Sequence, residues 1–351
     1  MKRFIATIAL LAAFALSAAA FTLEPMFSDG VVLAKGKPIR VFGEGEGRIS
    51  VSLAGKRAVC QAVDGRWEAV LPAMKAGGPY RMTVSYPGGK AVVEDVYIGT
   101  VIIMAGQSNI QFKLKESSSA PESWKSDPLL REFTLPRLEP GEPYTPEDGW
   151  VPCRADDAGN WSAIGYLVGN SLRQGNEHEA VGIINCYQGA SVIESWIPEE
   201  RIAGEFYHLP QDQIYRDHYH KVYGKWNGDG FLYHYTLEPL LPYAVSAVVW
   251  YQGESNTGSG EAAIYPLLAR ELVLSWREAF KDLSLPFTII QIADYVHRPD
   301  PSWKAVQEAQ LRIPVVVPGV TVVKSADVCE TDNIHPKTKD GLSERIAGTL
   351  R

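Results

Sequence analysis

Two patterns of hydrophobic and polar positions divide the chain at about residue 99. Before this point, runs such as RISVSLAG, WEAVLPA and YRMTVSYPGGKAVVEDVYIG alternate apolar and polar residues between glycine-rich breaks. Such alternation is typical of strands with one buried face, and Pro87-Gly88-Gly89 between two of these runs indicates a hairpin. We therefore predict that residues 21–98 form a small all-β module, a β-sandwich.

From residue 99 the apolar runs become continuous, as in TVIIMAG, AVGIINCYQGA, AVSAVVWYQGE and PFTIIQIADY. Runs of this kind are typical of parallel strands that are buried on both faces. Segments with helical periodicity lie between them, and AIYPLLARELVLSWREAFKD has the clearest apolar stripe. Strands that alternate with helices predict an α/β domain with a parallel sheet over residues 99–351.

Three of these buried strands end in turns that are rich in amides and hydroxyls. The turns are Gly106-Gln107-Ser108-Asn109, Gln188-Gly189-Ala190-Ser191 and Gln252-Gly253-Glu254-Ser255-Asn256. Glycine and polar residues end most strands, so one such turn alone is ordinary. Because ligands bind at the carboxyl ends of strands in open α/β sheets, three similar turns at one edge predict a site there.

Ser108 is the candidate nucleophile of this site. A serine hydroxyl attacks an acyl carbon only when a neighbouring base takes its proton. His335 is the predicted base, and Asp332, three residues earlier, is the acid predicted to orient its imidazole. The alternatives are a Ser108 that caps a helix, a histidine that is a plain loop residue, and an Asp332 that caps a helix or is solvated.

An ester hydrolase also needs N–H donors where negative charge develops on the carbonyl oxygen. The backbone N–H groups of Ser108 and Gly189 suit this role, since Gly189 has no side chain to keep a substrate away. A side-chain amide of the third turn, Gln252 or Asn256, is predicted to complete the oxyanion site. Supporting roles are predicted for Asn109, Glu254 and Asn256. Glu254 would orient Gln252 or an arginine, or it would be a buried residue with a structural hydrogen bond.

The chain begins with MKRFIATIALLAAFALSAAAF, a pattern typical of a secretory signal. Lys2 and Arg3 give a positive start, an apolar stretch follows, and small residues precede a predicted cleavage after Ala20. A membrane anchor is the alternative, but spanning requires about 20 apolar residues and a cationic stop is missing. We therefore predict export to the periplasm or the extracellular space, without stable membrane insertion.

Charge and metal-ligand spacing argue against several partners. The formal net charge is −7 without a basic cluster, so nucleic acid is not expected as a partner. His218 and His220 form an H-x-H pair, but no third ligand has a telling spacing and a solvated loop is favoured. No metal and no cofactor are expected. Four cysteines match no zinc motif, and their pairing stays open: Cys60, Cys153, Cys186 and Cys329.

Four segments together resemble the sialate O-acetylesterase family of SGNH-type serine esterases: MAGQSN, YQGASVIESWIP, LEPLLPYAVSAVVWYQGESN and NIHPKTK. The opening EPMFSDGVVLAKGKPIRVFGEGEG resembles the N-terminal β segment of the same proteins. The resemblance implies a flavodoxin-like three-layer α/β/α domain behind a small β-module, and removal of O-acetyl groups from sugars without a metal.

Carried over residue by residue, the resemblance places the family's serine at Ser108, its histidine at His335, its glycine at Gly189 and its amide at Gln252. For the acid, Asp332 stays the prediction, with Asp327, Glu330 and a Ser–His pair as alternatives. The expected partner is an acetylated carbohydrate, either sialic acid or a polysaccharide such as acetylxylan. A carbohydrate-binding surface protein without turnover is the alternative from another class. The sequence does not indicate an oligomeric state.

Overall fold

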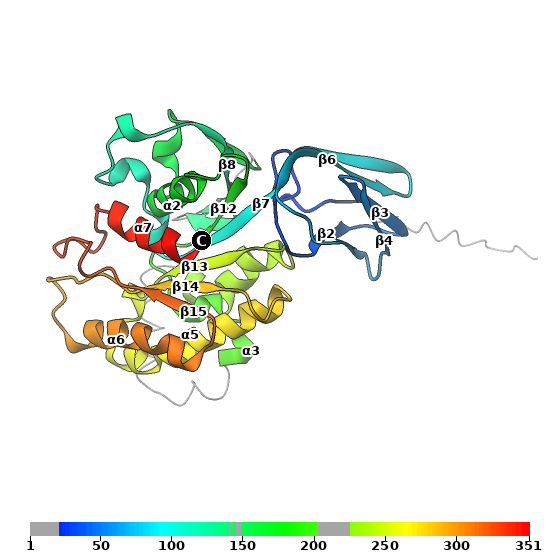
Figure 1. Cartoon of the computed structure of the whole chain (residues 1–351). Helices are drawn as coiled ribbons and strands as arrows, with labels where there is room; N and C mark the ends of the chain where they lie inside the picture. Colours follow the sequence, from blue (N-terminus) through cyan, green and yellow to red (C-terminus); the bar gives the residue numbers. More distant parts are fainter. Residues whose placement is uncertain (1–20, 140–141, 145–148, 203–224) are drawn as a thin grey trace, which may run out of the picture.

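The computed structural model describes residues 21–139, 142–144, 149–202 and 225–351 (Figure 1). The predicted signal segment 1–20 and the pair His218 and His220 lie outside the described residues. Within the described part of the chain, no helix combines the length and the apolar character that crossing a membrane requires.

An N-terminal β region is present, as the alternating pattern predicts. Within it β3 pairs with β4 and β6, and β2 pairs with β5 in a separate two-stranded sheet. The apolar positions of the alternating strands face inward, and Val41, Ile49, Val51 and Trp67 are buried. The strands are β1 (Val32–Ala34), β2 (Ile39–Glu44), β3 (Arg48–Leu53), β4 (Lys56–Gln61), β5 (Arg66–Leu71) and β6 (Gly77–Tyr86).

One long strand, β7 (Gly89–Gly106), joins this region to the rest of the chain. Its first part pairs with β6 and β1, and its second part pairs with β12 and β13. The predicted boundary at residues 98 and 99 therefore falls inside a strand that both parts share. Ser108 follows directly beyond the carboxyl end of this strand.

The central sheet has the order β11-β8-β12-β7-β13-β14-β15, and its strands are parallel apart from β11. The continuous apolar runs are buried on both faces, and all eight residues of β12 are buried. The predicted α/β domain with a largely parallel sheet is confirmed. The remaining strands are β8 (Asp127–Thr134), β11 (Val151–Cys153), β12 (Ala180–Tyr187), β13 (Ala247–Tyr251), β14 (Phe287–Ile290) and β15 (Val320–Val323), with β9 (Arg137–Glu139) and β10 (Glu142–Tyr144) pairing apart.

Helices cover both faces of this sheet (Figure 1). Helix α2 packs on α7 on one side, and α5 packs on α6 on the other. The apolar stripe predicted for α5 is buried through Leu268, Leu272 and Trp276. The helices are α1 (Ser108–Gln111), α2 (Ala163–Arg173), α3 (Glu199–Ile202), α5 (Ser259–Ala279), α6 (Pro301–Val316) and α7 (Asp340–Thr349).

Candidate active site

The turns after β7, β12 and β13 meet at one edge of the sheet because these three strands are neighbours. Backbone hydrogen bonds join the turns: Gln188 N–H donates to Gly106 O over 3.0 Å, and Gln107 N–H donates to Tyr251 O over 3.0 Å. Gly106 has a φ of +132°, and a Cβ there would lie 2.1 Å from Tyr251 O. This close approach requires glycine.

The side chain of Gln107 fixes the third turn to the first. Its Oε1 accepts the backbone N–H groups of Gly253 and Ser255, over 3.3 and 3.2 Å. Gln107 is buried, and it begins the turn in which α1 starts at Ser108. The position of α1, which begins at Ser108, is therefore set by hydrogen bonds to a neighbouring strand end.

Ser108 and His335 are in hydrogen-bond contact. Ser108 Oγ lies 2.7 Å from His335 Nε2. His335 lies on the loop between β15 and α7, where its own N–H donates to Asn333 Oδ1 over 2.9 Å. Burial lowers the pKa of His335, and the charge of Lys339 lowers it further. A neutral imidazole beside a serine hydroxyl can accept its proton, which is the arrangement that a serine nucleophile needs.

Gly189 lies beside Ser108. A Cβ at this position would lie 3.9 Å from Ser108 Cβ and 3.2 Å from Gln111 Oε1. In the described ranges, the backbone N–H groups of Ser108 and Gly189 make no hydrogen bond within the protein. Two N–H donors next to the hydroxyl are therefore available to a substrate oxygen.

The side chain of Gln252, predicted for the oxyanion site, makes its hydrogen bonds inside the protein in this structure. Its Nε2 donates to Ser191 O over 3.1 Å and to Asn256 Oδ1 over 2.6 Å, and its Oε1 accepts the hydroxyl of Tyr265. Both amide hydrogens are used inside the protein and the residue is fully buried. The side-chain amide of Gln252 thus has no N–H left for an oxyanion.

Asn256 holds the second and third turns together. Its Oδ1 accepts the backbone N–H of Ile193 over 3.0 Å as well as the Gln252 amide, and its Nδ2 donates to Glu194 over 2.8 Å. Asn256 is fully buried, like Gln252. The side-chain amides of the third turn therefore hold the neighbouring segments of the candidate site in place.

The side chain of Asn109, next to Ser108, makes three hydrogen bonds. Its Nδ2 donates to Glu254 Oε1 over 2.7 Å and to Ile334 O over 2.9 Å. Its Oδ1 accepts from Lys339 Nζ over 2.9 Å. The predicted supporting residues Asn109 and Glu254 thus contact each other, and the asparagine also reaches the residue before His335.

None of the three candidate acids contacts the imidazole in this structure. Asp332 is exposed, and among the described residues it makes no hydrogen bond with His335. Asp327 forms two hydrogen bonds of 2.6 Å with Arg345. Glu330 accepts the backbone N–H groups of residues 337 and 338, and so shapes the loop that carries His335.

Residues 99–348 match the family described as carbohydrate esterase, sialic acid-specific acetylesterase. The chain belongs to this family. It is a carbohydrate esterase by this assignment, and the resemblance read from the four sequence segments is confirmed. The match begins inside β7, just before the nucleophile turn, and ends in α7, just after the histidine loop.

Relatives of this carbohydrate esterase have similar descriptions. The chain is 30% identical to a carbohydrate acetylesterase from Xanthomonas citri of known crystal structure, with a TM-score of 0.81 over 94% of this chain and 74% of that one. It is 24% identical to the sialate O-acetylesterase of Homo sapiens, over 93% of this chain and 69% of the human protein. It is 23% identical to that of Mus musculus, over 80% of this chain and 62% of the mouse protein.

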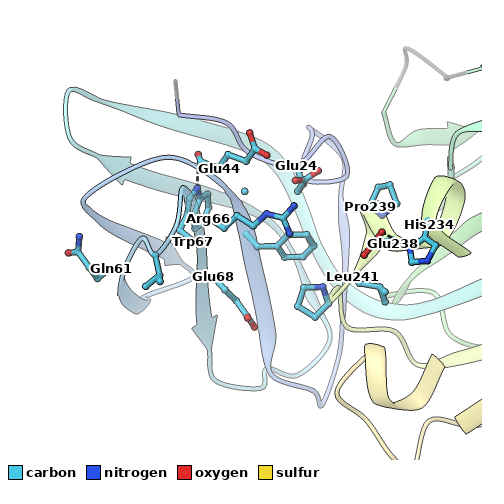
Figure 2. Close-up of a pocket in the computed structure, with 14 residues that line it drawn as sticks. Glu24, Glu44, Gln61, Arg66, Trp67, Glu68, His234, Glu238, Pro239 and Leu241 are labelled. Atoms are coloured by element: carbon cyan, nitrogen blue, oxygen red, sulfur yellow. Dashed lines mark hydrogen bonds and ion pairs between the residues drawn. The ribbon is translucent and has the colours of Figure 1, made fainter. Parts of the chain in front are cut away.

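A cleft of about 670 Å³ lies between the N-terminal region and the esterase domain (Figure 2). Arg66 and Trp67 of β5 line it from one side, and His234 and Glu238 line it from the other. Residues 238–242 precede β13, so the cleft lies toward the amino ends of the strands, away from Ser108. This cleft is separate from the candidate active site of the esterase.

Within the ranges that the structure describes, no group of three His, Cys, Asp or Glu side chains could hold a metal ion. The four cysteines are free thiols, and Cys153, Cys186 and Cys329 are buried.

Sequence reasoning missed Lys339 and Asn333. Lys339 is fully buried beside the site, although lysine in a polar loop segment indicates a solvated side chain. Asn333 accepts the N–H of His335 two residues later, a local turn for which asparagine is a known signal. The role of Asn333 could have been found in the sequence, whereas the burial of Lys339 depends on long-range packing.

Proposed function

We propose that this carbohydrate esterase removes O-acetyl groups through an acetyl-enzyme on Ser108, with His335 as general base and then general acid. The observation that carries the proposal is the 2.7 Å contact between Ser108 Oγ and His335 Nε2. It lies at the carboxyl edge of a parallel sheet, where ligands of such sheets bind.

In the first half of the reaction, Ser108 Oγ bonds to the acetyl carbonyl carbon while His335 Nε2 takes the hydroxyl proton. The tetrahedral intermediate collapses when the bond between the carbonyl carbon and the sugar oxygen breaks, and Nε2 returns the proton to that oxygen. In the second half, water attacks acetyl-Ser108 and gives its proton to Nε2. Ser108 Oγ then leaves with that proton, and acetate is released.

The backbone N–H groups of Ser108 and Gly189 are the proposed oxyanion donors. They lie next to the nucleophile and make no hydrogen bond within the described part of the protein. One donor of this type typically contributes about 10²–10³-fold to the rate. Gln252 supports them indirectly because it fixes the turn around Ser191.

Asp332 is the proposed orienting acid. Its exposed carboxylate lies on the same loop as His335, and among the described residues His335 Nδ1 makes no hydrogen bond. Catalytic hydrogen bonds are often long without substrate and tighten in the complex. The imidazolium that forms during the reaction would attract the carboxylate to Nδ1. A Ser–His pair that works without an acid is the alternative.

O-acetylated sialic acid is the proposed substrate, and acetylated polysaccharide such as acetylxylan is the second candidate. The family description and the names of the human and mouse relatives support sialic acid, whereas the Xanthomonas citri protein is described only as a carbohydrate acetylesterase. A binding protein without turnover has less support, because the serine and histidine are both present and in contact.

Three finer expectations belong to the same proposal. The helical layers on both faces of the sheet support a flavodoxin-like three-layer SGNH-type domain (Figure 1). The two sheets of residues 21–98 support a sandwich-like module. The signal-like first residues support export to the periplasm or beyond, with cleavage after Ala20.

Acetate release from a panel of substrates tests the proposal. O-acetylated sialic acids, acetylated xylan and acetylated pectin are each incubated with the wild-type protein and with Ser108→Ala. We expect release from sialic acids by the wild type and none by the variant. Release of acetate from xylan or pectin alone would overturn the proposal that sialic acid is the substrate. Equal release by both proteins, or no release by the wild type, would overturn the esterase mechanism.

A further inference from the structure

A buried lysine lies directly behind the catalytic pair. Lys339 is the residue before α7, and its side chain is fully buried although its sequence neighbours Lys337 and Thr338 are exposed. Lysine is almost never fully buried without a partner, because removing an ammonium ion from water is costly. The site must therefore compensate for this charge.

The compensation comes from one strong hydrogen bond and two aromatic faces. Lys339 Nζ donates to Asn109 Oδ1 over 2.9 Å. It also lies 5.2 Å from the ring centre of Phe112 and 5.7 Å from that of Tyr251. Cations within about 6 Å of a ring face are attracted to it.

Acidic groups face the ammonium from two directions. Glu254 lies on the turn after β13, and Glu330 lies on the loop after β15. Glu254 and Lys339 are bridged by the two ends of the Asn109 amide. Burial lowers the pKa of Lys339 to about 8, so the ammonium form still predominates at neutral pH.

The bridge connects the two halves of the active site. Asn109 follows Ser108 on α1, and its Nδ2 donates to the carbonyl of Ile334, the residue before His335. The amide of Asn109 can make these contacts in only one orientation, because Lys339 requires its oxygen and Glu254 requires its nitrogen. Lys339 thus determines which end of the amide faces the histidine loop.

The same charge acts on the imidazole. A cation near a histidine disfavours imidazolium, and Lys339 contributes to the lowered pKa of His335 after the larger effect of burial. Exposed Glu116 acts in the opposite direction. The lysine therefore helps His335 to remain a neutral base.

We propose that Lys339 is a positioning residue of the reaction: through Asn109 it holds the loop of His335 against the helix of Ser108, and its charge favours neutral imidazole. This inference rests on the proposed function for its effect on turnover. Its effect on the pKa of His335 can be measured without a substrate.

Lys339→Met, with Lys337→Met as the matched control, tests the proposal. Methionine keeps much of the length and removes the buried charge, and replacing buried ions by apolar side chains is often tolerated. Loosening of a catalytic geometry by about 1 Å costs on the order of 10²-fold. We therefore expect kcat of Lys339→Met to fall by about that factor, with KM unchanged and with no change in Lys337→Met.

Two further variants separate the contribution of the Asn109 bridge from that of the Lys339 charge. In Asn109→Ala the bridge is broken but the charge stays, so kcat should fall while the pKa of His335 is kept. At a pH where His335 is fully neutral, a second change, Lys339→Met in the Asn109→Ala background, should then lower kcat little further, since the charge effect is absent there and the two residues otherwise act through one link. Asn109→Ala also tests the proposal if Lys339→Met does not fold.

Carbon-13 NMR titration of labelled histidines reads His335 directly, with its signal assigned from its loss in His335→Gln. We expect its pKa to rise in Lys339→Met and to stay unchanged in Lys337→Met. Wild-type kcat in Lys339→Met or in Asn109→Ala would overturn the positioning role, and an unchanged titration in Lys339→Met would overturn the charge effect. If neither the wild type nor any variant hydrolyses acetate esters, the esterase proposal fails. The titration still decides whether Lys339 lowers the pKa of His335.

Discussion

Ser108 Oγ and His335 Nε2 lie 2.7 Å apart although 227 residues separate them in the chain. The strand β7 carries the serine to the edge of the sheet, and the loop before α7 returns the histidine to the same edge. Hydrogen bonds between the strand-end turns hold the serine in place. The contact is thus a property of the whole sheet and of its crossovers.

Replacement of His335 by Asn should lower kcat for a chromogenic acetate ester by about 10²–10⁴-fold, since a general base typically contributes this much. The thermal midpoint should change little, because His335 is only partly buried. His297→Asn, at an exposed position, is the control and should keep full activity. Full activity in His335→Asn would remove histidine from the mechanism.

Asp332→Asn should lower kcat by at least about 10²-fold while the folded state keeps its stability, because loss of an orienting carboxylate leaves the wrong tautomer. The exposed position of Asp332 makes a large effect on folding unexpected. Asp327→Asn is the matched comparison, since this rival acid is paired with Arg345. Wild-type turnover of Asp332→Asn would show that a Ser–His pair is sufficient.

The pH dependence of kcat/KM should have an acidic limb below pH 6.5, the ordinary pKa of histidine. Burial first, and Lys339 second, lower the pKa of His335. The base must be neutral to accept the serine proton, so activity rises as pH passes upward through this lowered pKa. Initial rates between pH 4 and 8 measure the limb, and a midpoint above 6.5 would contradict the assignment.

Gly106→Ala should destabilise the fold by about 3 kcal/mol or more, because backbone strain and a steric clash add. A Cβ at Gly106 would lie 2.1 Å from Tyr251 O in the adjoining strand. Gly55→Ala is the matched control: Gly55 also has a positive φ of +75°, but nothing lies within 4 Å of its added Cβ. Urea unfolding should therefore show a much smaller loss for Gly55→Ala, and equal losses would refute the clash.

The exported protein should begin at Phe21. The signal-like segment ends in small residues, and cleavage after Ala20 fits that pattern. N-terminal sequencing of the protein recovered from the periplasm or the medium identifies its first residue. A chain that keeps Met1 and stays in the cell would contradict the predicted export.

Much of the fold follows from local pattern. Continuous apolar runs identified the strands that carry Ser108 and Gly189, because strands buried on both faces must be apolar throughout. The change of pattern at residues 98 and 99 marks the point where β7 passes from alternating to nearly continuous burial, and it falls inside one strand because β7 pairs with both parts. The extent of β7 depends on its partners β6 and β12.

The site was predictable where chemistry is local and not where it depends on partners. The proximity of Ser108 and His335 was predictable because a serine nucleophile needs a neighbouring base, and their catalytic roles stay predictions. The sequence cannot tell whether the amide of Gln252 faces a substrate or bonds within the protein. Only its contacts with Ser191 and Asn256 show that both side-chain N–H groups are occupied. Lys339 was not among the residues to which the sequence pointed, because its burial comes from packing on distant elements.

Covalent labelling with a fluorophosphonate tests the central claim most directly. Such a reagent modifies an activated serine hydroxyl, and peptide mass spectrometry then locates the adduct. The account predicts one adduct per chain, on Ser108, with loss of acetate release in proportion to labelling and no adduct in Ser108→Ala. Full activity in a labelled protein, or an adduct on another serine with Ser108 unmodified, would contradict it.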